Sequence, residues 1–148
     1  MIGRRFDSRY SGHHGNMDSR YIQRSSIFRT QWKCRGKVYK VFISSGSITN
    51  IVSDEMLGKL NIEKITHITP YRVYGMNNDQ WIDVKEQAYI SFSIGSYCDT
   101  ILCDAMPLGD FHIILGRVWQ DDVRSLYDGS KNTYVINKNG KEFVMSSL

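Results

Sequence analysis

The sequence has few cysteines, two prolines and no long hydrophobic run. Its three cysteines, Cys34, Cys98 and Cys103, are too few and too widely spaced for a disulfide framework. Cys98 and Cys103 fall on one expected strand at positions of opposite parity, so their side chains point to opposite faces and cannot pair with each other. Reduced thiols are typical of a cytoplasmic or nuclear protein, and we expect that location.

Signals for membranes, export and metals are also missing. No apolar run reaches the ~18 residues of a membrane-spanning helix. The first residues include no apolar segment of the kind found in secretory signals, so we expect none. His13 and His14 are adjacent, and no cysteine or histidine has zinc-ligand spacing. We therefore predict no metal, no cofactor and no membrane partner.

The charge is unevenly distributed along the 148 residues. Residues 1–40 hold ten Lys or Arg against two Asp, a net charge of +8, whereas residues 41–148 hold nine against thirteen acids, a net charge of −4. Residues 1–26 show no helix or strand period and are rich in Arg, Ser and Gly, which predicts a disordered basic arm or linker. Aromatic residues interleave with its arginines, so nucleic acid is a candidate partner for residues 1–40.

Residues 27–148 are predicted to form one mostly-β domain. Short alternating segments are separated by turn residues every ten or so positions, a spacing that favours a closed or nearly closed barrel with one or two short helices. Ser53 is a good N-cap for a helix ending at Leu60, and residues 117–126 give a second helical stripe of Val118, Trp119, Val123 and Leu126. Hairpins are expected at 27–43, 71–84, 88–104 and 133–145, with single strands at 48–52 and 113–116.

Two apolar strands that end in glycine turns organise this domain. Val41-Phe42-Ile43 runs into Ser44-Ser45-Gly46-Ser47, and Ile113-Ile114-Leu115 runs into Gly116-Arg117. Such runs read as buried strands that stop at tight turns. We expect Ile43, Ile113, Ile114 and Leu115 to serve ordinary barrel packing.

Over residues 26–148 the chain resembles the retropepsin-like aspartic protease domain of plant gypsy-type LTR retrotransposon Gag-Pol polyproteins. The resemblance rests on the order and spacing of five segments. They are Val41–Ser47 together with Asn50–Ser53, Tyr71-Arg72-Val73, Ser93–Tyr97, Ile101–Asp104 and Ile114–Gln120, while Ile48 and Thr49 depart from the family's pattern. It implies the closed-barrel fold of an acid protease, a homodimer, and an extended peptide or polyprotein as substrate.

The resemblance also places the catalytic turn. That family needs an Asp-Ser/Thr-Gly turn from each of two subunits, whose paired carboxylates share one proton and activate water. Here the family's Asp aligns with Ser44, while Ser45 and Gly46 occupy the other two positions. A serine hydroxyl is not charged near neutral pH and cannot act as that base unaided, so we predict an inactive domain.

Two further sets of residues follow from the resemblance. The hairpin at 71–84 corresponds to the family's flap, which closes over an extended peptide. The residues assigned to peptide binding are Tyr74, Gly75, Met76, Asn77 and Asn78. The residues assigned to the second turn, at the dimer core, are Ile114, Leu115, Gly116 and Arg117.

Other interpretations remain open at this point. Ser44 would serve as a nucleophile only with a base such as His112 within reach. Asp104 is expected to be a surface or turn carboxylate, Asp121 and Asp122 to face solvent, and Asp128-Gly129-Ser130 to form a turn. A subunit carrying the missing Asp would supply half of the catalytic pair, and a nucleic-acid-binding module built on residues 1–40 is the third hypothesis.

Overall fold

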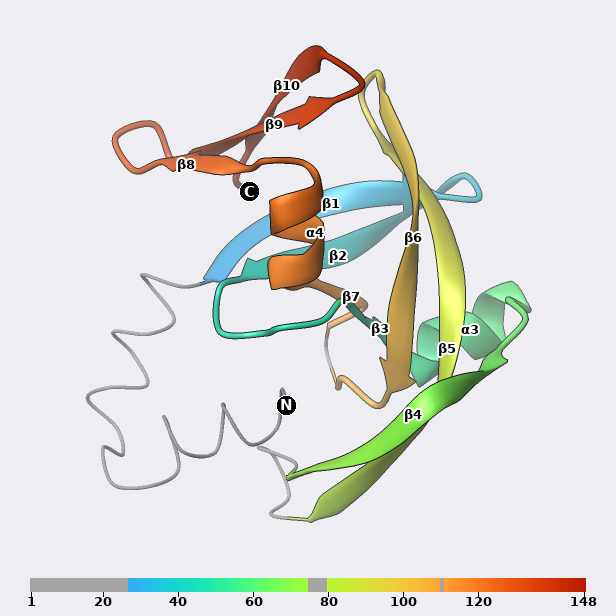
Figure 1. Cartoon of the computed structure of the whole chain (residues 1–148). Helices are drawn as coiled ribbons and strands as arrows, with labels where there is room; N and C mark the ends of the chain where they lie inside the picture. The colour runs from blue at the N-terminus through green and yellow to red at the C-terminus, as the bar shows by residue number, and fades with distance from the viewer. Residues whose placement is uncertain (1–26, 75–79, 110) are drawn as a thin grey trace.

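The computed structural model describes residues 27–74, 80–109 and 111–148. The predicted arm at 1–26 and the flap-tip residues Gly75, Met76, Asn77 and Asn78 lie outside these ranges. Ten strands and two helices form the described structure (Figure 1). In chain order they are β1 (Ile27–Cys34), β2 (Lys37–Ser44), β3 (Ile51–Ser53), α3 (Asp54–Leu60), β4 (Ile65–Tyr74), β5 (Trp81–Ile94), β6 (Tyr97–Met106), β7 (Ile113–Leu115), α4 (Arg117–Asp122), β8 (Leu126–Asp128), β9 (Thr133–Lys138) and β10 (Lys141–Ser146).

The main sheet is a ring with one strand attached outside it. Its order is β1-β2-β7-β3-β6-β5-β4, and an additional pairing of β1 with β5 joins Lys33 to Ser93. That pairing closes every strand except β4 into a barrel. The predicted mostly-β barrel with two short helices is therefore confirmed.

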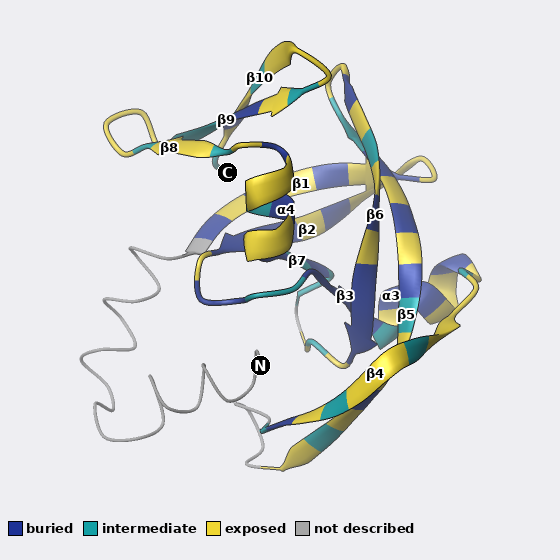
Figure 2. Ribbon diagram, viewed as in Figure 1, coloured by how far each residue is buried: buried dark blue, intermediate teal, exposed yellow. Residues whose placement is uncertain are grey.

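The barrel interior holds most of the large apolar side chains. Trp32 of β1 stacks on Phe92 of β5, with ring centroids 3.4 Å apart. Trp119 of α4 reaches in from one end and donates its indole N–H to the Tyr97 hydroxyl at 3.2 Å. Buried strand segments appear dark blue in Figure 2, and the outer face of α4 is exposed. Each of these rings contributes about 2 kcal/mol of burial free energy relative to an exposed one.

The two helices begin as their sequences predict, but the second ends early. Ser53 caps α3 by accepting a hydrogen bond from the Met56 N–H at 3.2 Å, a contact worth about 1 kcal/mol. The prediction that α4 continues to Leu126 is wrong. It ends at Asp122, because Arg124 adopts a left-handed φ of 47° and turns the chain into β8.

That early end moves two residues out of the predicted apolar stripe. Trp119 and Val123 are buried as expected, whereas Val118 is 47% exposed and Leu126 is 71% exposed. Asp121 and Asp122 face solvent, as predicted. Strands β8, β9 and β10 then form a small antiparallel sheet, and Asp128 accepts hydrogen bonds from Ser130 in the predicted turn.

Cys98 and Cys103 point to opposite faces of their strand, as their spacing predicts. Cys98 is exposed and Cys103 is buried on the same strand β6, and all three cysteines are free thiols. Across residues 27–74, 80–109 and 111–148, neither the length nor the hydropathy of any helix is sufficient to traverse a bilayer.

Candidate functional site

The two glycine turns predicted from the sequence lie side by side. Strands β2 and β7 run parallel, with Val41 opposite Ile113 and Ile43 opposite Leu115. Ser44 therefore ends β2 next to the point where Gly116 ends β7. Ile43, Ile113 and Leu115 are fully buried in the barrel, as expected.

Gly116 is required by the closeness of the two turns. A Cβ at this position would lie 2.2 Å from the Thr49 carbonyl oxygen and 2.8 Å from that of Ser47. The backbone of Gly116 donates to the Asn50 side chain at 3.1 Å, and the Arg117 N–H donates to the Ser47 carbonyl at 2.8 Å. These bonds fix the loop that follows Ser44 against the start of α4.

Ser44 itself is buried within this frame. It is 5% exposed, and its Oγ accepts a hydrogen bond from the Gly46 N–H at 3.2 Å. Its carbonyl accepts from the Gln120 side-chain amide of α4 at 3.1 Å. Ser45, next to it, is exposed, and Gly46 is buried. The turn thus offers hydroxyl and peptide groups where the resemblance calls for a carboxylate.

His112 lies away from Ser44. Its Nδ1 accepts the Lys40 N–H at 3.0 Å, and its ring packs edge-on against Tyr39 at 5.1 Å. Lys40 precedes Ser44 by four residues on β2, a distance of about 13 Å along an extended strand. Burial and the nearby Lys40 and Lys59 lower the pKa of His112. Ser44 therefore receives no base from this histidine.

A second apolar cluster lies between the predicted flap and the turn region. We define the flap as the hairpin of residues 71–84; its described strands, 71–74 of β4 and 81–84 of β5, project from the barrel at the foot of Figure 1. The buried members of the second apolar cluster are Ile51, Val73, Val84 and Met106. The half-buried residues packed on this cluster are Ile48, Tyr71, Ile82, Leu108 and Ile114. Ile114 belongs to this cluster and not to the main core, which corrects the expectation that it serves barrel packing. Tyr74 is half-buried beside Trp81.

Asp104 contradicts the expectation of a surface or turn carboxylate. It is 3% exposed at the inner end of β6 and accepts hydrogen bonds from Tyr71 at 2.5 Å, Gln87 at 2.9 Å and Thr49 at 3.2 Å. His67 Nε2 lies 3.1 Å from it. We call these five side chains the Asp104 cluster. They line part of a cavity of about 590 Å³ whose other walls include Pro70, Leu102 and Val118.

The Asp104 cluster was missed because its members are far apart in the sequence. Asp104 is buried because β6 pairs with β3 and β5 at this point, with Ile51 and Gln87 as its two partners. The one local signal is that Asp104 follows Ile101-Leu102-Cys103 and precedes Ala105-Met106, an unusually apolar setting for an aspartate.

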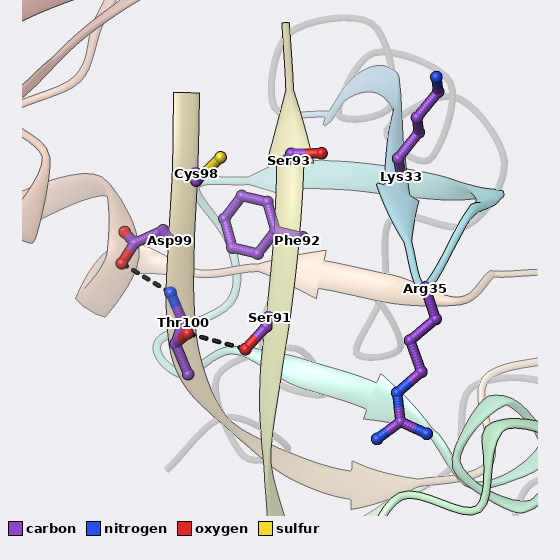
Figure 3. Close-up of a pocket in the computed structure, with 8 residues that line it drawn as sticks. All are labelled: Lys33, Arg35, Ser91, Phe92, Ser93, Cys98, Asp99 and Thr100. Carbon is purple, nitrogen blue, oxygen red and sulfur yellow. Dashed lines mark hydrogen bonds between the residues drawn. The ribbon is translucent and has the colours of Figure 1, made fainter. Parts of the chain in front are cut away.

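Another hollow, of about 480 Å³, lies where β1 meets β5 and β6. Figure 3 shows its two cationic side chains, Lys33 and Arg35, extending in different directions. Arg35 donates to the Leu60 carbonyl. Asp99 already accepts from Lys138 and Tyr97. The polar groups do not converge, so this hollow is not the candidate site. Within the described ranges no group of three or more metal-ligating side chains occurs.

Among the comparisons with known proteins, the one with solved structures bears on the fold. No protein-family model and no curated protein matches the sequence. Among solved structures, 90 chains are similar. One is the retroviral protease-like domain of Ddi1 from Leishmania major, with a TM-score of 0.57 and 10% sequence identity over 83% of this chain and 94% of that chain. At this identity the likeness concerns the fold alone, and this chain has the retropepsin-like fold of a retroviral protease-like domain.

Proposed function

We propose that this chain is a proteolytically inactive retropepsin-like domain, derived from a plant gypsy-type Gag-Pol polyprotein, that retains an extended-peptide groove. The observation that carries the proposal is Ser44, which stands at the end of β2 beside Gly116, where the resemblance assigns the catalytic aspartate. Loss of the carboxylate removes a general acid–base contribution of ~100- to 10,000-fold from each subunit of a homodimer.

The second apolar cluster supports the retained groove. Ile48, Ile82 and Ile114 are half-buried between the flap and the turns, so part of their apolar surface remains accessible. An extended peptide under the flap would cover this surface while its backbone pairs with neighbouring strands. Because the groove needs no carboxylate at position 44, peptide binding survives the Ser44 substitution.

Restoring the carboxylate tests the proposal. We expect Ser44→Asp to cleave denatured casein at mildly acidic pH and pepstatin to stop it, whereas the natural chain does not cleave. Ser45→Asp is the matched control, because it adds the same charge at the neighbouring exposed position and should remain inactive. Cleavage by the natural chain would refute inactivity. If neither the natural chain nor Ser44→Asp cleaves casein, and both are dimers by size-exclusion chromatography, the assignment of Ser44 to the catalytic position fails.

A second candidate function is nucleic-acid binding, and the β1–β2 hairpin favours it. Arg29 and Lys33 of β1 and Lys40 of β2 are exposed on one outer face, since Gln31 pairs with Lys40. Arg35 and Lys37 extend the positive charge to the turn.

Fluorescence anisotropy with a single-stranded oligonucleotide separates the two functions. If nucleic acid is the ligand, affinity falls steeply between 50 and 200 mM salt. Lys33→Glu/Lys40→Glu should then abolish binding, and Lys131→Glu/Lys141→Glu, which reverses two exposed charges elsewhere, should weaken it far less. Equal loss in both double variants would refute a specific patch on this hairpin.

A further inference from the structure

Asp104 is held on both sides by backbone as well as by side chains. Its N–H donates to the Asn50 carbonyl at 2.8 Å, and it stands opposite Ile51 of β3 and Gln87 of β5. The carboxylate therefore has a fixed position between the loop that follows Ser44 and the inner part of the flap hairpin. Its four side-chain contacts come from that loop (Thr49), from β4 (His67, Tyr71) and from β5 (Gln87).

Most of the acceptor capacity of this carboxylate is used. A carboxylate offers about four acceptor positions, and Tyr71 and Gln87 donate to two of them. The single Thr49 hydroxyl hydrogen is shared with the Asn50 carbonyl, and His67 Nε2 lies 3.1 Å from Oδ1. His67 is engaged at both nitrogens, because its Nδ1 accepts the Thr69 N–H at 3.0 Å while Nε2 faces Asp104. Asp104 thus has little acceptor capacity left for a further partner.

The irregular pairing of strand β4 indicates the role of the Asp104 carboxylate. Its pairing with β5 shifts register between Thr66 and Tyr71, so the ladder holds Ile65 and Thr66 and resumes only at Tyr71. The intervening backbone bulges outward, and Ile68 is 90% exposed. At either end of this bulge, the side chains of His67 and Tyr71 contact Asp104.

We propose that Asp104 is a positioning residue that fixes the base of the flap, residues 65–71 and 84–87, above the peptide groove. The proposal rests on the peptide-binding function proposed above. The Tyr71 side chain connects the Asp104 cluster with the second apolar cluster, because its hydroxyl donates to Asp104 while its ring packs on the second apolar cluster. A flap base released from Asp104 would leave the groove wall unfixed.

Hydrogen exchange measured by mass spectrometry on the natural chain tests this without any activity. Tyr71→Phe removes one donor and keeps the ring, and we expect amides of the flap base, at 65–71 and 84–87, to exchange about tenfold faster. Tyr89→Phe is the matched control, since Tyr89 lies on β5 at 59% exposure. Acceleration confined to the flap base supports the proposal. Equal acceleration in β9 and β10, or no difference from Tyr89→Phe, overturns it.

A pair of substitutions at position 104 sharpens the test. Asp104→Asn can accept from Gln87 and His67 with its oxygen and donate to the hydroxyls of Tyr71 and Thr49, so it should keep most of the protection. Asp104→Leu has the same number and branching of side-chain heavy atoms without polar ones and should lose it. If Asn and Leu behave alike while both proteins stay folded, hydrogen bonding by this residue does not position the flap base.

The Ser44→Asp background adds a kinetic readout. With casein as substrate, Tyr71→Phe should raise KM several-fold with a smaller change in kcat, because a misplaced flap weakens binding. A purely structural role would lower the amount of active protein, hence the apparent kcat, and leave KM unchanged; that result overturns positioning. If Ser44→Asp is inactive although it is a dimer, the assignment of Ser44 to the catalytic position fails, and hydrogen exchange alone decides the role of Asp104.

Discussion

The Ser44 turn and the Asp104 cluster are two polar regions of the same barrel. The first lacks an expected carboxylate, and the second holds an unexpected one. At Ser44 the resemblance calls for a carboxylate, and the chain supplies a hydroxyl whose oxygen accepts one backbone N–H. At Asp104 the chain supplies a buried carboxylate, and four side chains contact its oxygens. A carboxylate needs a free lone pair to act as a base. The position of a carboxylate is therefore a poor guide to its chemistry until its hydrogen bonds are counted.

Gly116→Ala breaks the Ser44 side of this comparison and should have the largest effect. The added Cβ would meet backbone oxygens of Thr49 and Ser47 at 2.2 and 2.8 Å, and backbone cannot rotate away as a side chain can. We expect a loss of about 3 kcal/mol or more in the free energy of unfolding, measured by urea denaturation.

Gly58→Ala is the matched control for that substitution. Gly58 lies in α3 with open space around it, so an alanine should stabilise the chain by about 0.5–1 kcal/mol. If both alanines have the same effect, close approach at the two turns is not what requires Gly116.

The reactivity of the Cys103 thiol tests whether β6 is closed to solvent next to Asp104. Burial, together with the neighbouring Asp104 charge, raises the pKa of this thiol well above its usual range. Cys98 is exposed on the same strand. We expect iodoacetamide at pH 8 to modify Cys98 at least tenfold faster than Cys103, because the thiolate is the nucleophile. Asp104→Leu should narrow this ratio by opening the cluster. Rapid labelling of Cys103 in the natural chain would show that this end of β6 is not closed.

The smallest expected effect is a pH dependence of stability that comes from His112, which lies beside Lys40 and away from the Ser44 turn. The pKa of His112 is lowered by burial and by Lys40 and Lys59, with Glu55 opposing them. The unfolded chain therefore binds this proton more readily, so stability is fully present above the usual pKa of about 6.5 and falls below it. Thermal unfolding should show a decline from pH 7 to pH 5 that is smaller in His112→Gln. An equal decline in both proteins would assign it to other groups.

Local sequence signals predicted the barrel well. Alternation marked β5 and β6, the β1–β2 hairpin was predicted although alternation in β1 is broken, and Ser53 followed by Asp54 and Glu55 marked the start of α3. The end of α4 was misjudged because apolar periodicity continued through Leu126, while the left-handed conformation of Arg124 has no glycine or asparagine to announce it. The Asp104 cluster was missed for a different reason. Its contacts join residues 49, 67, 71, 87 and 104, and single-sequence patterns carry no information on such pairings.

The parallel pairing of β2 with β7 has a consequence for how the chain folds. Ile43 and Leu115 become neighbours only after the whole intervening segment has been brought back, and β1–β2 alone is a local hairpin. Long-range pairing of this kind costs loop-closure entropy before it yields contacts, so it slows folding. During synthesis the first hairpin emerges and pairs well before its parallel partner exists. The two turns are therefore assembled late, and a nascent chain that stops before residue 113 leaves the buried edge of β2 exposed to aggregation.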